Sequence, residues 1–180
     1  MKWTPTKVKT GKTMKELILL TTSVIGFVTF FTVIAIKFGI LKSISASDYE
    51  FRSMWAFTIF TWWCSVPLIF AGILGPFTNL QRLLVTFSGI FWMLVGAAPS
   101  SKNIDVEKPI HNIGASGAGF TAYAFSLLAA IKIPYLWFVV VPSLVVIAYM
   151  YLKKTKNHTW WIETIAYVAN ILVLYLFLTK

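Results

Sequence analysis

Three polar side chains share one stripe of the last apolar segment of the chain. Glu163 is followed at +4 and +7 by Tyr167 and Asn170, so all three lie on one face if the segment is helical. A carboxylate, a phenol and an amide cannot face lipid cheaply, so this stripe should point into a helical bundle. It forms either a polar packing network between helices or the wall of a polar cavity that binds a ligand.

His111 is the second candidate for chemistry, because imidazole titrates near neutral pH. It follows Asp105 and Glu107 closely and stands at the start of another apolar segment. One interpretation is a hydrogen-bonded residue at the membrane interface. The alternatives are a proton-dependent switch near neutral pH and a general base that acts with Glu163, so His111 and Glu163 are the catalytic candidates.

A metal site would require three or four protein ligands. The available candidates are spread over three loops without an HxxxH or HExxH spacing: Asp48, Asp105, His111, His158 and Glu163. His158 follows a lysine-rich loop and is expected at the level of the lipid headgroups. Cys64 is the single cysteine and lies in an apolar run, which excludes an intrachain disulfide and a cysteine-based metal site. The sequence predicts no cofactor.

The elements that must position these residues are membrane helices. The chain is 58% hydrophobic and 12% charged, about half the charged fraction of soluble domains. Apolar runs of roughly 20 residues match the thickness of a bilayer. We therefore expect an all-α integral membrane protein, a bundle of six transmembrane helices over residues 16–36, 54–73, 80–98, 110–131, 134–152 and 159–178.

The expected helices form one transmembrane domain over residues 16–180. Residues 1–15 carry five lysines and are expected to be a basic segment on the membrane surface, where Pro5 and Gly11 argue against a long regular helix. The first apolar run is longer than that of a signal peptide and has no convincing cleavage site, so it is interpreted as a retained anchor.

Six helices would place loops one, three and five on one face of the membrane. That face collects five of the six carboxylates and both histidines. The residues expected to bind a ligand there are Asp48, Tyr49, Asp105, His111, Glu163, Tyr167 and Asn170.

Lysine and arginine divide evenly between the two faces, but the five lysines before the first helix favour cytoplasmic termini. The net charge of +10 is scattered over loops, so no nucleic-acid partner is expected.

The longest polar interruption of the chain, residues 96–119, ends in a run of small residues. Ala115 and Gly119 are four apart, and Gly114 precedes them. Small residues at this spacing let membrane helices approach closely, so these three residues are expected to serve helix packing. A phosphate-binding loop is not indicated, because no Lys-Ser or Lys-Thr pair follows.

Three short motifs carry a family resemblance. They are SISASDYE after the first helix, GAAP after the third, and H-x-x-G-A at the start of the fourth, which contains His111, Gly114 and Ala115. Over residues 14–178 the chain resembles bacterial six-helix membrane proteins of unknown function related to the eukaryotic DRAM/Frag/Sfk group. The resemblance implies a helical bundle without established catalysis in the bacterial cytoplasmic membrane. The eukaryotic relatives are associated with lipid homeostasis, membrane trafficking and regulation of lipid-modifying enzymes.

Three functions stay open at the level of the sequence. The first is a non-enzymatic protein that senses or binds membrane lipids, or that associates with another membrane protein or with itself. The second is a membrane-embedded lipid hydrolase or transferase that uses His111 and Glu163. Seven-helix ceramidase-like hydrolases offer a weaker resemblance, but this chain lacks their paired HxxxH and has one helix fewer. The third is a proton-coupled transporter, for which no internal repeat is visible.

Overall fold

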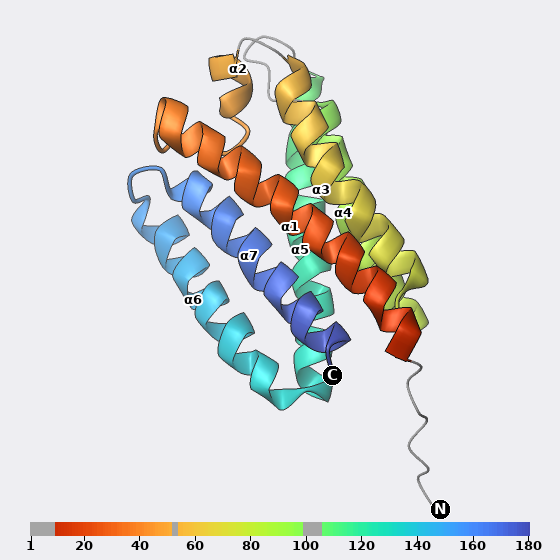
Figure 1. The fold of residues 1–180 in the computed structure, drawn as a ribbon. Coiled ribbons are helices and arrows are strands. Elements are labelled where there is room, and N and C mark those ends of the chain that lie inside the picture. Colours follow the sequence, from red (N-terminus) through yellow and green to blue (C-terminus); the bar gives the residue numbers. More distant parts are fainter. Residues whose placement is uncertain (1–9, 52–53, 99–105) are drawn as a thin grey trace, which may run out of the picture.

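The computed structural model describes residues 10–51, 54–98 and 106–180, and these residues form an all-helical bundle (Figure 1). The elements are α1 (Thr10–Phe38), α2 (Ser47–Phe51), α3 (Met54–Leu74), α4 (Asn79–Ala97), α5 (Glu107–Lys132), the 3₁₀ turn η1 (Pro134–Leu136), α6 (Trp137–Lys153) and α7 (His158–Leu178). Within the described ranges, six helices are long and apolar enough to cross a membrane: α1, α3, α4, α5, α7 and α6 with its preceding turn. The predicted six-helix membrane bundle is confirmed.

Two features of the first third of the chain differ from the sequence prediction. Helix α1 begins at Thr10, inside the expected surface segment, and Gly11 lies in its first turn. A glycine costs a helix about 1 kcal/mol relative to alanine, which is too little to end a helix of 29 residues. The loop after α1 contains the short helix α2, which was not predicted.

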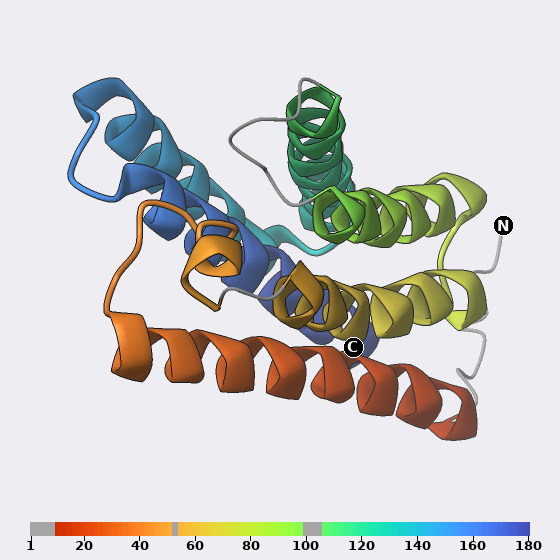
Figure 2. The ribbon, with the colours of Figure 1, turned by 90° about the horizontal axis from the view of Figure 1, so that it is seen from above.

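Five helices form a ring, and α6 lies outside it. Helix α3 packs against α4, α4 against α5, and α1 against α3, while α7 completes the ring through less extensive contacts with α5 and α1. Helix α6 pairs with α7 and also contacts α5. Figure 2 shows this arrangement from above, with α1 and α5 on opposite sides of α3. The ring is therefore tight from α1 through α5 and looser where α7 closes it.

Small residues make the tight part of the ring possible. A Cβ atom added to Gly96 of α4 would collide with the side chain of Thr61 on α3. A Cβ atom added to Gly114 of α5 would lie 2.9 Å from the carbonyl oxygen of Phe91 and 3.0 Å from the amide nitrogen of Val95, both on α4. At Gly96 a side chain of α3 packs directly on the α4 backbone, and at Gly114 the backbones of α4 and α5 are in contact, where larger side chains would separate the helices.

The loop after α1 is anchored to the start of α7. The Trp160 amide donates to the Lys42 carbonyl at 3.2 Å, and the side-chain amide of Asn157 donates to the Ile40 carbonyl at 3.0 Å. Asn157 adopts a left-handed conformation with φ 57°, which asparagine tolerates better than most residues. These bonds bring the first and fifth loops of the bundle together on one membrane face.

Candidate functional site

A cavity of about 350 Å³ lies inside the ring, within the range of volumes that ligand pockets usually have. Its wall combines residues of α3, α4, α5 and α7 with two residues of the first loop, Ile44 and Ser45. Most of the lining is apolar. The cavity lies where α7 closes the ring, which is the loosely packed part of the bundle.

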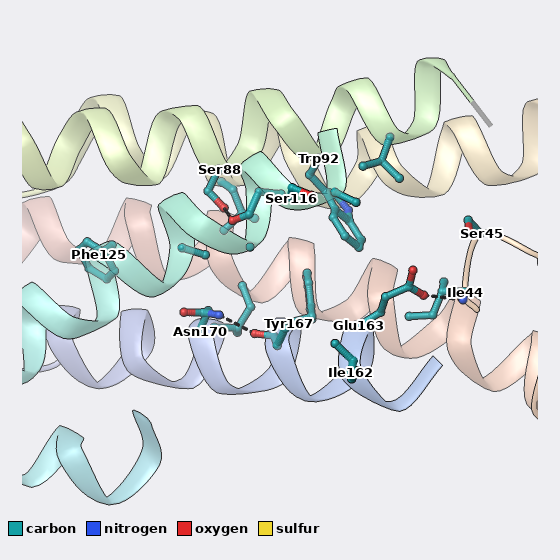
Figure 3. A pocket seen from close by; sticks show the side chains of 18 of the residues that line it. Ile44, Ser45, Ser88, Trp92, Ser116, Phe125, Ile162, Glu163, Tyr167 and Asn170 are labelled. Carbon is teal, nitrogen blue, oxygen red and sulfur yellow. Dashed lines mark hydrogen bonds between the residues drawn. The ribbon is translucent and has the colours of Figure 1, made fainter. Parts of the chain in front are cut away.

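Glu163 marks one end of the cavity. Its Oε2 atom accepts a hydrogen bond of 2.6 Å from the backbone amide of Ile44 (Figure 3). Ile44 lies in the non-helical stretch between α1 and α2, so its amide has no helical partner and the carboxylate supplies one. Ser45 and Thr159 line the same end, which makes this end the polar one.

Tyr167 lines the cavity one turn further along α7, and it also joins α7 to α1. Its hydroxyl lies 2.7 Å from the hydroxyl of Ser23, and its ring stacks on Phe27 with 3.9 Å between the ring centroids. The Ser23 hydroxyl donates in turn to the Cys64 carbonyl of α3 at 2.8 Å. Because each hydroxyl has one proton, the Tyr167 proton is directed at Ser23, either at its hydroxyl or at its carbonyl oxygen 3.1 Å away.

Asn170 completes the stripe on α7, and it too lines the cavity. Its side-chain amide donates to the Ala166 carbonyl at 2.7 Å, and its Oδ1 atom accepts from the Ser126 hydroxyl of α5 at 2.5 Å. The stripe of Glu163, Tyr167 and Asn170 thus contributes to the cavity wall and to a polar network at the same time. The sequence left open a polar packing network or a cavity wall, and in the structure the same three residues form both.

A stripe on α4 faces α7 across the cavity, and the sequence analysis did not identify it. It consists of Val85, Ser88, Trp92 and Val95. Ser88 donates to the Ala118 carbonyl of α5 at 3.3 Å, whereas the Nε1 atom of Trp92 is buried without a partner. The i, i+4 spacing of Ser88 and Trp92 within an apolar helix was the available signal.

The opposite end of the cavity is apolar. Leu68, Val85, Phe125 and Leu174 line it there and belong to one buried hydrophobic cluster. Two lining residues, Ser116 of α5 and Thr159 of α7, are exposed. The cavity therefore runs from a polar end to an apolar end inside the bundle, and its lining reaches the surface on α5 and α7.

His111 is not among the residues that line the cavity. It is buried at the start of α5, and its Nδ1 atom lies 2.9 Å from the Ala98 carbonyl oxygen at the end of α4. A carbonyl only accepts, so Nδ1 carries the proton. The predicted catalytic pairing of His111 with Glu163 is not assembled in the structure. His111 instead joins the ends of two neighbouring helices.

The acidic residues of the first loop also lie outside the cavity lining. Asp48 is buried on α2, and its Oδ1 atom has no hydrogen-bond partner. Burial raises the pKa of Asp48, and the nearby charge of Glu107 raises this pKa further. Tyr49 is exposed on α2, and Asp105 lies outside the described residues. Asp48 in the first loop and Glu107 at the start of α5 therefore lie close enough to interact electrostatically.

The predicted packing residues of α5 divide into two groups. Gly114 is buried against the α4 backbone, whereas Ala115 and Gly119 line the cavity. A Cβ atom added to Gly119 would meet no atom within 4 Å, so the predicted packing role is wrong for this residue. The spacing of small residues cannot distinguish a helix contact from open space, because either accommodates glycine.

The metal-ligand candidates do not cluster where the structure describes them. No group of three or more His, Cys, Asp or Glu side chains there could hold a metal ion. His158 lies at the start of α7, with its Nδ1 atom 3.1 Å from the Thr155 carbonyl oxygen. That contact closes the turn before α7.

Comparison of the chain with protein-family models, with curated proteins and with solved structures finds no match. The resemblance to proteins related to the DRAM/Frag/Sfk group therefore stays a prediction. The function has to be argued from the cavity and its lining.

Proposed function

We propose that this integral membrane protein binds a single-chain amphiphile in the cavity between α4, α5 and α7. The observation that carries the proposal is the polarity of the cavity, with Glu163 and Ser45 at one end and the cluster containing Phe125 at the other. An amphiphile has the same division, because its chain gains from leaving water while its head must keep hydrogen bonds.

The dimensions of the cavity also suit one chain. Glu163 and Leu174 both line it and are 11 residues apart on α7, which corresponds to about 16 Å along a helix axis. A narrow site of this length accommodates a medium-length acyl chain. The exposed residues Ser116 and Thr159 give the ligand a route between α5 and α7, from the headgroup level of the bilayer into the ring.

We propose binding and not turnover as the primary activity. The carboxylate of Glu163 accepts from a backbone amide, and the hydroxyl of Ser88 donates to a backbone carbonyl. A hydrolytic site needs a nucleophile within reach of a general base. The histidine expected to be that base, His111, bonds to Ala98 outside the cavity.

The test is native mass spectrometry of the purified protein with monolauroylglycerol as the defined probe. Gly119→Leu should reduce probe binding by about tenfold or more, the equivalent of 1.4 kcal/mol, because the new side chain extends into open cavity. Phe120→Leu is the matched control, since Phe120 is 76% exposed at the adjacent position of the same helix. The control should bind as the wild type does.

Equal binding by wild type and Gly119→Leu would contradict the proposal, because the probe would then sit elsewhere on the protein. Thermal unfolding of both variants checks that the bundle is intact. Monolauroylglycerol binding that is lost in Gly119→Leu but kept in Phe120→Leu would support the cavity as the binding site.

We further propose that both termini face the cytoplasm of a bacterial cell, as the basic residues before the first membrane helix favour. The single cysteine, Cys64, is buried, which suits labelling with a membrane-impermeant maleimide. The exposed positions Glu50 and Thr179 lie at opposite ends of the bundle. Glu50→Cys should react in intact cells and Thr179→Cys only after permeabilisation; the reverse pattern would overturn this orientation.

A further inference from the structure

Trp92 presents an unused hydrogen-bond donor at the cavity. Its side chain lines the cavity, and its Nε1 atom is buried without a partner in the structure. The indole N–H can only donate, and leaving a buried donor unpaired is costly. A ligand that fills the cavity would remove this cost if it placed an acceptor, such as a carbonyl oxygen, near Trp92.

Glu163 presents the complementary group from the opposite wall. One of its oxygens accepts from the Ile44 amide, and a carboxylate can accept further hydrogen bonds. Figure 3 shows Trp92 extending from α4 and Glu163 extending from α7 into the space between these helices. The pair therefore offers one donor and one acceptor on opposite walls at the polar half of the cavity.

We propose that the bound amphiphile has an uncharged head in which a hydroxyl or amide donor stands next to an acyl carbonyl. The carbonyl accepts from Trp92, the head donates to Glu163, and the chain extends towards Phe125. Acyl esters of glycerol and acyl amides of small amino alcohols share this chemistry. A phosphate head would instead place negative charge against a carboxylate that no described lysine or arginine neutralises. This inference rests on the proposed function.

The test compares three lauroyl-length probes on the intact protein by native mass spectrometry. Monolauroylglycerol carries a carbonyl and hydroxyls, its dodecyl ether analogue lacks the carbonyl, and lauroyl glycerol phosphate adds the anionic group. The wild type should bind the ester about fivefold more tightly than the ether, the effect of one hydrogen bond, and should bind the phosphate more weakly than both.

Trp92→Phe separates this proposal from a general effect of the cavity. The substitution removes the N–H and keeps an aromatic ring, so it should abolish the preference for the ester over the ether, measured as the ratio of the two affinities within the variant. Trp55→Phe is the matched control, because Trp55 is 74% exposed and does not line the cavity. Glu163→Gln should raise the affinity for the phosphate probe relative to the ester, because it removes the negative charge of the carboxylate.

The outcomes distinguish the two proposals. If no probe binds, or if Gly119→Leu binds every probe as well as the wild type, the proposed function fails. If Gly119→Leu abolishes binding but ester and ether bind the wild type equally, or Trp92→Phe keeps the ester preference, only the head chemistry fails. The proposed head chemistry also fails if the wild type binds the phosphate probe more tightly than it binds the ester.

Discussion

The hydroxyl of Tyr167 lies 2.7 Å from the hydroxyl of Ser23, and this contact joins α7 to the rest of the ring. Ser23 also donates to the Cys64 carbonyl, so three helices meet at one chain of hydrogen bonds. Elsewhere α7 contacts α1 and α5 sparingly. The helix that carries the stripe of the cavity wall is thus joined to α1 and α3 by a chain of hydrogen bonds as well as by apolar packing.

Tyr167→Phe should lower the stability of the bundle by about 1 kcal/mol, the usual net value of one hydrogen bond. Stacking on Phe27 survives the substitution, so the loss reports the hydroxyl alone. Thermal unfolding in detergent measures it. Tyr175→Phe on the exposed side of the same helix is the control and should leave the unfolding temperature unchanged. An equal effect in both variants would contradict a specific role for the Ser23 contact.

Two glycines on α5 should respond in opposite ways to alanine. Gly114→Ala places a methyl group against the α4 backbone and should destabilise the protein by about 1–3 kcal/mol, as overpacking does. Gly119→Ala meets no neighbour within 4 Å and should be neutral or slightly stabilising, because alanine favours a helix. Unfolding of the two variants under identical conditions measures the difference. Similar stabilities would show that α5 does not pack on α4 as described.

The sequence was sufficient for the helices and for the shared face of Glu163, Tyr167 and Asn170. Both follow from local rules, namely the thickness of the bilayer and the period of a helix. The partners of these residues could not be predicted in the same way. The Ile44 amide and the Ser23 hydroxyl reach α7 only through tertiary packing, which no local spacing encodes.

The sides of the cavity formed by α4 and α5 were missed for a related reason. Trp92 and Gly119 line it from helices α4 and α5, and each has an ordinary interpretation when taken alone, as an interface aromatic or a packing glycine. Only the relative positions of α4, α5 and α7 turn these residues into one wall. The predicted pairing of Glu163 with His111 failed because a shared membrane face is a much larger region than a shared site.

Asp48 should make the stability of the protein depend on pH. Its pKa is raised in the folded protein by burial and by Glu107, so above about pH 4 the folded state holds more protons than the unfolded state. Stability should therefore fall as the pH rises through the range between the unfolded and folded pKa values, and level off once Asp48 is ionised in both states.

Asp48→Asn should remove this fall, because asparagine does not titrate. Thermal unfolding between about pH 4 and pH 8 measures it, a range that begins at the ordinary pKa of aspartate. Glu50→Gln is the control on the same short helix, since Glu50 is exposed, and it should keep the wild-type profile. An unchanged slope in Asp48→Asn would assign the pH dependence to another group.

The turn between α6 and α7 contains two left-handed residues whose substitution by glycine should differ in outcome. Lys154 has φ 46° and Asn157 has φ 57°. Glycine removes the strain of this conformation at both positions, so Lys154→Gly should be neutral or stabilising by up to about 1 kcal/mol. Asn157→Gly also loses the side-chain hydrogen bond to the Ile40 carbonyl, so this variant should stabilise the protein less than Lys154→Gly does, or should destabilise it.

That bond holds the first loop against α7, next to the Ile44 amide that contacts Glu163. Asn157→Gly should therefore also weaken binding of monolauroylglycerol, by loosening the polar end of the cavity, whereas Lys154→Gly should leave binding unchanged. Native mass spectrometry of the two variants at one probe concentration makes the comparison. Weaker binding in Lys154→Gly alone would contradict the role assigned to the anchored loop, because it would locate the effect in the turn itself.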